Sequence, residues 1–467
     1  MSLLGRVWAW ALPAVILAIL FGLASGSDAL AWVARVGMIV YVVAEWRRQA
    51  TMAKGVILFG IVLALLTVSL ADAPSEALIE ALDRFAFLGA FLACLGLLRV
   101  AAEDSPLMRQ CGQYLIQQPP QRRYLTLSTG SGLFGIILNI GVLNLLGVMS
   151  LRGNTLAAAG GHQAVWQARR RRMFVAMLRG FAMVPLISPL GISLAVILSA
   201  LPQLTWFAIA PYAFATAALM FVLGWLLDRL AAPKHLKGLA PERIRLSPRP
   251  LIAFCTLVAG IVALTFLLAY LMAVQLPVAV IFSAPLSALI WLALQRRRLG
   301  GGSGVRRAGL SIARRADRIF PGMRGEIVVL GGAGFLGVLL GQLLPVETIA
   351  AALYESGMKG PWLAFAVTLV IVLAAQIGLN PIVSVTVLAT LLADPAALGL
   401  PPALLATALM AGWSLSMVSS PITAAMLIVG RLLNTSPYTV GYRWNGLFVI
   451  GCLLLLMVWF PFLGRWS

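Results

Sequence analysis

The stretch that decides the fold is residues 121–153, which read QRRYLTLSTGSGLFGIILNIGVLNLLGVMSLRG. Its apolar part, 123–150, is preceded by Arg122 and Arg123 and followed by Arg152. Because Lys and Arg of membrane proteins collect in cytoplasmic connections, both ends are expected on the same side of a membrane. Such a segment cannot cross once. It predicts a re-entrant hairpin, which is tolerated at membrane depth only where protein or a water-filled cavity surrounds it.

The composition around this stretch is that of a membrane protein. Of 467 residues, 61% are hydrophobic and 11% are charged, whereas a soluble domain carries roughly 25% charged residues. We therefore expect an all-α polytopic membrane protein with about eleven transmembrane helices plus two re-entrant hairpins. Runs of about 20 apolar residues span a ~30 Å hydrocarbon core. The predicted spans are 8–26, 30–45, 55–71, 84–102, 174–200, 206–228, 250–272, 277–294, 324–343, 403–432 and 446–464.

The placement of the basic residues, which give the chain a net charge of +20, orients these spans. In a soluble protein it would suggest a nucleic-acid partner, but here the basic residues are expected to control topology, so no nucleic acid is expected. The N-terminus resembles a signal peptide, yet further spans follow at once, and an uncleaved first span is expected. The protein is then a multi-pass protein of a bacterial inner membrane, with its N-terminus cytoplasmic and its C-terminus periplasmic. The acidic residues assigned outside are Asp28, Asp72, Glu76, Glu80, Asp83, Glu347, Glu355 and Asp394.

A second hairpin is predicted at 361–393. Glu355 and Lys359 precede it and Asp394 follows, in connections assigned to the outside. Its 33 residues are long for one span. This hairpin is expected to enter from the external face.

The two hairpins belong to an internal repeat. Leu138-Asn139 in the first corresponds to Leu379-Asn380 in the second, and each hairpin is followed by a helix interrupted at Ser-Pro. Since the hairpins enter from opposite faces, the repeats are expected to be inverted, as in many secondary transporters. The predicted parts are an extra span 1–29, a first repeat 30–230, a cytoplasmic linker 231–249, and a second repeat 250–467 with a Gly-rich basic linker at 295–323.

The expected binding site lies at the hairpin tips and the helix breaks. Proline inside a helix removes a backbone hydrogen bond, and unwound backbone in a membrane offers carbonyls to cations and N–H groups to anions. The alternatives are an ordinary proline kink and an asparagine that caps a hairpin helix. The candidate solute- or ion-binding residues are Asn139, Asn144, Ser188, Pro189, Asn380, Ser384, Ser419, Ser420, Pro421 and Thr423.

Charged and metal-binding groups are scarce in the apolar segments. No Asp or Glu lies deep in either hairpin or either broken helix, so a carboxylate proton relay is not expected. Arg179 is expected to snorkel to the interface, or otherwise to assist an anion. Cys94, Cys111, Cys255 and Cys452 show no metal-ligand spacing, so neither a disulfide framework nor a metal or other cofactor is expected. Coupling to Na⁺ or H⁺ stays open.

On these features the chain resembles the ion transporter superfamily, in particular its divalent anion/sodium symporter branch. The second half carries the resemblance best, in IGLNPIVSVTVLATL (377–391) and PALLATALMAGWSLSMVSSPITAAMLIVG (402–430). The family has a Ser-Asn-Thr signature at each hairpin tip, whereas this chain has Leu138-Asn139-Ile140 and Leu379-Asn380-Pro381. The resemblance implies a homodimer and elevator-type movement of the hairpin domain against a scaffold.

The function expected from the sequence is secondary active transport of a small, anionic solute, and not catalysis. One alternative is a membrane enzyme acting on a lipid-linked substrate, which would need acid–base residues in a sizeable external loop. The other is a permease subunit of a multi-component transporter. No Gly-rich loop followed by Lys-Ser/Thr occurs in the chain, so an ATPase would be a separate subunit.

Overall fold

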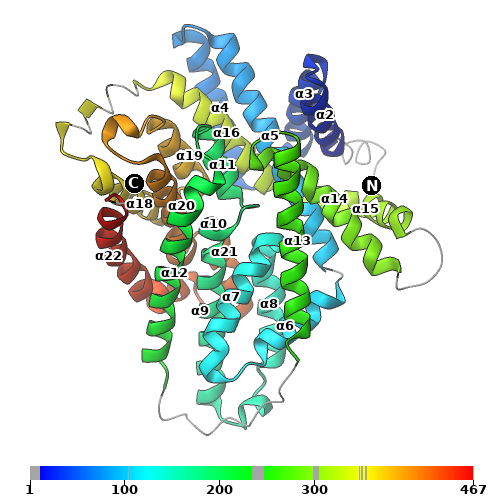
Figure 1. The fold of residues 1–467 in the computed structure, drawn as a ribbon, viewed down its shortest axis with the longest axis vertical. Coiled ribbons are helices and arrows are strands. Elements are labelled where there is room, and N and C mark those ends of the chain that lie inside the picture. Colours follow the sequence, from blue (N-terminus) through cyan, green and yellow to red (C-terminus); the bar gives the residue numbers. More distant parts are fainter. Residues whose placement is uncertain are drawn as a thin grey trace.

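The computed structural model describes residues 11–103, 105–233, 247–297, 304–345, 348, 351–352 and 355–465. Every regular element among them is a helix. Ten of these helices are long and apolar enough to cross a membrane, and three shorter ones are apolar. The predicted class, an all-α polytopic membrane protein, is therefore confirmed (Figure 1).

Each of the eleven predicted spans corresponds to a helix or to a broken helix. The first is the shorter apolar helix α2, whose segment begins before the described residues. The spans are α2 (Ala11–Ser25), α3 (Asp28–Glu45), α4 (Thr51–Leu70), α5 (Pro74–Glu103), α9 to α11 (Gln163–Ala182, Val184–Ile187, Ile192–Ala200), α12 (Trp206–Leu230), α13 (Arg249–Leu271), α14 (Leu276–Arg297), α16 (Arg324–Leu343), α20 and α21 (Pro402–Ser419, Ala424–Leu433) and α22 (Asn445–Leu463).

Residues 123–150 form two helices, α7 (Pro120–Leu138) and α8 (Gly141–Gly153), joined at Asn139 and Ile140. A Cβ added at Gly153, where α8 ends, would lie 3.3 Å from Ile116, just before α7 begins. The start of α7 and the end of α8 are thus neighbours, as in a helical hairpin.

Residues 361–393 also form a helical hairpin, α18 (Gly360–Gln376) and α19 (Pro381–Leu391). A Cβ at Gly360 would lie 3.3 Å from the carbonyl oxygen of Gly399, beyond the end of α19. The two ends of this hairpin therefore also lie together.

The same pairs of elements pack in both halves of the chain. α7 lies along α9, and α18 lies along α20. Across the halves, α11 packs on α19 and α21 packs on α8 (Figure 1). Each broken helix therefore crosses from the hairpin of its own half to the hairpin of the other.

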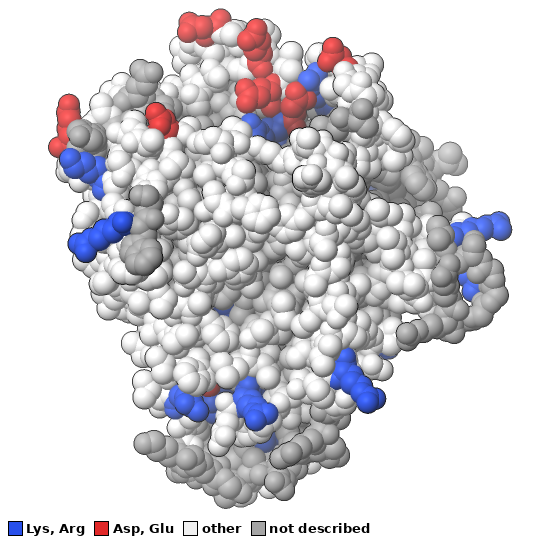
Figure 2. All heavy atoms as spheres, in the orientation of Figure 1, with Lys and Arg blue, Asp and Glu red and all other residues white. Residues whose placement is uncertain are grey.

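Charge separates along the long axis of the molecule. Figure 2 shows most acidic side chains at the upper end, with a few basic ones among them, and the other basic side chains at the lower end and on both flanks. Polar contacts join elements distant in sequence. Arg84 of α5 donates to the Ser199 carbonyl of α11, and Gln203 donates to the Ala393 carbonyl (3.4 Å), whereas Arg324 pairs with Glu45 (3.0 Å).

Two helices differ from the prediction. The connection 295–323, expected to be a Gly-rich linker, contains the helix α15 (Gly304–Gly322), which packs against α14 and α5. Val305, Ala308 and Ile312 recur at helical spacing there, which favours an amphipathic helix once a partner surface exists. The helix α6 (Pro106–Ile116) precedes the first hairpin and was not predicted. Most of the linker 231–249, namely 234–246, lies outside the described residues.

Candidate functional site

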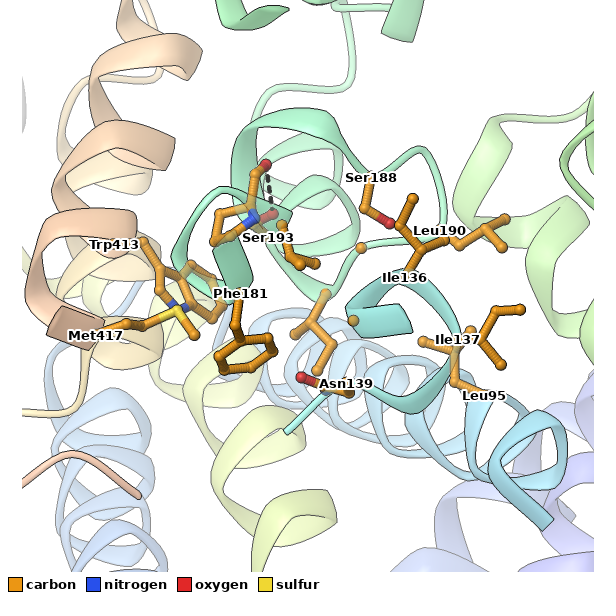
Figure 3. Close-up of a pocket in the computed structure, with 15 residues that line it drawn as sticks. Leu95, Ile136, Ile137, Asn139, Phe181, Ser188, Leu190, Ser193, Trp413 and Met417 are labelled. Carbon is orange, nitrogen blue, oxygen red and sulfur yellow. Dashed lines mark hydrogen bonds between the residues drawn. The ribbon is translucent and has the colours of Figure 1, made fainter. Parts of the chain in front are cut away.

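A cavity of about 60 Å³ lies where the first hairpin tip meets the first helix break. Asn139 comes from the tip and Ser188 from the break, whereas Trp413 and Met417 come from α20 of the second half (Figure 3). Leu95 of α5 lies on the far side. The cavity therefore joins the two halves at residues that the sequence singled out in the first half.

The backbone at Asn139 places its side chain at the tip of the hairpin. Its φ is +49°, one of three positive φ values among the described non-glycine residues. With its ψ of −135°, the residue is close to the conformation of the first central position of a type II′ turn, where Gly, Asn and Asp dominate. Its carboxamide lines the cavity and forms no hydrogen bond within the described part of the chain. Two donors and an acceptor are thus available to a bound solute or to water.

The first break lies between α10, which ends at Ile187, and α11, which begins at Ile192. Ser193 bridges it by donating a 3.0 Å hydrogen bond to the carbonyl of Pro185 (Figure 3). Ser188 is 0% exposed, and its hydroxyl has no hydrogen-bond partner among the described residues. An unsatisfied buried hydroxyl costs about 1–3 kcal/mol, so this group suits a water or a ligand in the cavity.

Close backbone contact holds the first hairpin against the broken helix. A Cβ at Gly180 of α9 would collide with the carbonyl oxygen and Cα of Ser128 on α7. Nearby, Ser131 donates a 2.8 Å hydrogen bond to the carbonyl of Met177. Small residues of this kind allow helices in a membrane to approach closely.

The second break, between α20 and α21, is closed by its own hydroxyl groups. Ser420 donates to the carbonyl of Ala375 on α18 (2.7 Å), and Thr423 donates to the carbonyl of Ser420 (2.9 Å). Ser419 accepts a 3.0 Å hydrogen bond from Gln376. Pro421 is buried at the break. These candidate residues lie together, but their hydrogen bonds are made within the protein.

Asn380 differs from Asn139 in its bonding. Its Oδ1 accepts a 2.8 Å hydrogen bond from the backbone N–H of Ile382, so it caps the N-terminus of α19. Ser384 lies one turn further and donates to the Asn380 carbonyl at 3.5 Å. The capping alternative therefore describes Asn380, whereas Asn139 has no such bond.

Asn144 lies apart from the other candidates. It is exposed on α8 and lines a separate groove together with Arg99, Arg109 and Arg152. The cavity residues Trp413 and Met417 were not predicted. The one feature of the sequence that could have indicated them is their position, one to two helical turns before the Ser-Pro break in AGWSLSMVSSP (411–421).

The expectation that Arg179 snorkels to the interface was wrong. Arg179 is 6% exposed, and its guanidinium donates to the side chain of Asn445 and to two backbone carbonyls. Its partners come from α12 and from the start of α22, which the sequence separates from it by 45 to 266 residues.

No protein-family model and no curated protein sequence matches this chain. The solved structures that share its fold include a transporter and an efflux pump. The YdaH transporter of Alcanivorax borkumensis, whose topology is described as unusual, is 16% identical with a TM-score of 0.55, covering 88% of this chain and 98% of its own. MtrF of Neisseria gonorrhoeae, described within a class of antimetabolite efflux pumps, is 14% identical with a TM-score of 0.50, covering 87% of this chain and 94% of its own. The chain thus has the fold of a transporter and of an efflux pump.

Proposed function

We propose that this protein is a secondary transporter that moves a small, anionic solute across the bacterial inner membrane. The observation that carries the proposal is the cavity between Asn139 and Ser188, where a free carboxamide and an unpaired buried hydroxyl face a helix break. Such uncharged hydrogen-bonding groups beside unwound backbone are typical of transporter binding sites. The cavity of about 60 Å³ holds a few waters or a small ion.

The fold supports transport rather than catalysis. This chain matches nearly the whole length of two solved structures. One is described as a transporter and the other within a class of efflux pumps. At 14–16% identity the likeness extends to the fold, so the solute and the direction of transport are left to experiment.

The repeat and the elevator-type movement are part of the proposal. The pairing of α7 with α9 and of α18 with α20, and the crossed pairing of α11 with α19 and α21 with α8, supports an inverted repeat. The nearness of Gly153 to Ile116 and of Gly360 to Gly399 supports a topology in which both ends of each hairpin lie on one side. The placement of Lys and Arg supports a cytoplasmic N-terminus and a periplasmic C-terminus. The homodimer stays a prediction, which the mass of the protein in detergent would check.

The test is transport by the purified protein in liposomes. A panel of labelled small carboxylates and phosphates, with neutral and cationic analogues, would be measured in both directions, with and without Na⁺ and pH gradients. We expect anion movement above that of empty liposomes, strongly reduced by Asn139→Ala and not by Ser69→Ala, a substitution on the exposed face of α4. Movement of the neutral or cationic analogues alone would contradict the proposal.

A further inference from the structure

A groove of about 620 Å³ lies beside the first hairpin, between α5, α6 and α8. It is about ten times larger than the central cavity and falls in the range of about 300–1,000 Å³ found for small-molecule sites. The central cavity admits no organic solute at its present size, whereas the groove does.

The groove is electropositive. Arg99, Arg109 and Arg152 line it, and Glu103 is the one acidic lining residue in the part of the chain that the structure describes. Arg99 pairs with Glu103 at 2.8 Å. Arg109 and Arg152 are exposed, and neither forms an ion pair within the described residues. Guanidinium groups bind carboxylate and phosphate groups in a bidentate manner, so both side chains suit an anion.

One wall of the groove is apolar. Ile116, Leu145, Val148 and Met149 line it beside the arginines. The other polar residues of the groove, among them Gln113 and Asn144, are exposed. Exposing this number of polar groups to lipid hydrocarbon would be costly. The groove therefore faces water and suits an anion with an apolar body.

The hairpin tip separates this groove from the central cavity. Asn139 lines the cavity, whereas Leu138 and Gly141 line the groove. On α5, Leu95 lines the cavity and Arg99, one turn later, lines the groove. A Cβ at Gly141 would lie 3.3 Å from Nε of Arg99, so the first turn of α8 lies directly beside this guanidinium.

We propose that this groove is the docking site of the transported solute on the side assigned to the cytoplasm, and that the solute is an amphipathic anion. Its carboxylate or phosphate lies among Arg99, Arg109 and Arg152, and its apolar body lies on Val148 and Met149. The tip from Leu138 to Gly141 is the wall that the solute passes to reach the central cavity. This inference rests on the proposed function.

The test measures binding of phenyl phosphate and phenylacetate to the full-length protein in a neutral detergent by calorimetry. We expect Arg109→Gln/Arg152→Gln to weaken binding by at least about tenfold and to reduce its dependence on salt. The matched control, Arg122→Gln/Arg431→Gln, removes two exposed arginines outside the groove and should bind like the wild type. Glu103→Gln should tighten binding, because it releases Arg99 and removes the negative charge.

Equal loss in both double variants, or no binding of either anion by the wild type, would overturn the inference. So would binding at these arginines of phosphatidylglycerol in nanodiscs in place of the soluble anions, because the groove would then be a lipid site. Liposome transport separates the two proposals. If Arg109→Gln/Arg152→Gln moves anions normally, the groove inference fails and the transporter stands. If the groove binds anions but no anion is transported, the proposed function fails.

Discussion

The guanidinium of Arg179 donates a 3.0 Å hydrogen bond to the carboxamide oxygen of Asn445. It also donates to the carbonyls of Gly224 (3.2 Å) and Trp444 (3.4 Å) and lies over the ring of Phe448 at 4.5 Å. One buried side chain thereby ties α9 of the first half to α12 and to the junction of the π-helical turn Thr439–Trp444 with α22.

Replacing Asn445 with Leu should destabilise the protein by about 3 kcal/mol, because the buried charge of Arg179 loses its side-chain acceptor. The measurement is the change in Tm of the purified protein in detergent. In a double-mutant cycle, Arg179→Met/Asn445→Leu should be less destabilised than the sum of the single variants. Additive effects would show that the two residues act independently.

The substitutions Ser188→Ala and Ser420→Ala should have different effects on the thermal stability of the protein. The hydroxyl of Ser188 has no hydrogen-bond partner in the described ranges, so removing it should leave Tm unchanged or raise it, while transport falls. Ser420 donates to Ala375, so its removal should cost about 1 kcal/mol. Thermal melts and liposome transport, measured on both variants, check this. A fall in Tm for Ser188→Ala equal to that for Ser420→Ala would contradict the assignment of Ser188 to solute or water.

Gly180→Ala should prevent correct folding, because its methyl group would meet the backbone of Ser128 and backbone cannot step aside as a side chain can. The control is Gly260→Ala on α13, where nothing lies within 4 Å of the added methyl. That control should be neutral or stabilise by up to about 1 kcal/mol, since Ala favours helix over Gly. Yield of monodisperse protein by size-exclusion chromatography distinguishes them, and similar yields would argue against the close packing of α7 on α9.

Cys111 on α6 should resist alkylation. Burial raises the pKa of its thiol to about 12, with a further contribution from the nearby Cys255. A raised pKa keeps the thiol protonated below that pH, and only the thiolate is the nucleophile. Mass spectrometry after iodoacetamide treatment should find Cys111 unmodified at neutral and mildly alkaline pH and modified after unfolding. Full modification of the native protein at neutral pH would contradict its burial.

Membrane labelling tests the first hairpin. With Cys255→Ser as background, Arg122→Cys and Arg152→Cys should react with a membrane-impermeant reagent from the same side. Lys359→Cys and Asp394→Cys should both react from the opposite side. If positions 122 and 152 label from different sides, α7 and α8 form a crossing rather than a re-entrant hairpin, and the inverted repeat fails with it.

The local features of the fold could be predicted because each depends on residues close in sequence. Arg122 and Arg152 mark both ends of the first hairpin, and the Ser-Pro pairs at 188–189 and 420–421 mark the helix breaks. Hydrophobic runs located the spans, although α5 and α9 begin ten and eleven residues before the predicted starts, in segments that carry charged side chains. The helix α15 was missed because its amphipathic face needs a partner surface, α14, before it is stable.

The chemistry of the site depended on contacts distant in sequence. Nothing near Arg179 indicates that Asn445 would hold it inside the protein. Asn139 and Asn380 share the same Leu-Asn pair, yet only Asn380 is followed by a free helix N–H within reach of its side chain. The arginines of the groove come from α5, α6 and α8, and packing alone brings them together.

The contact of Gly180 with Ser128 restricts how the molecule can move. With the two backbones touching and Ser131 bonded to Met177, sliding α7 past α9 would force main-chain atoms through each other. The first hairpin and its broken helix therefore form one mechanical unit. Any transport movement must carry this unit whole, and the sliding surfaces must be sought where it meets the helices around it, among them α5, α12 and α20.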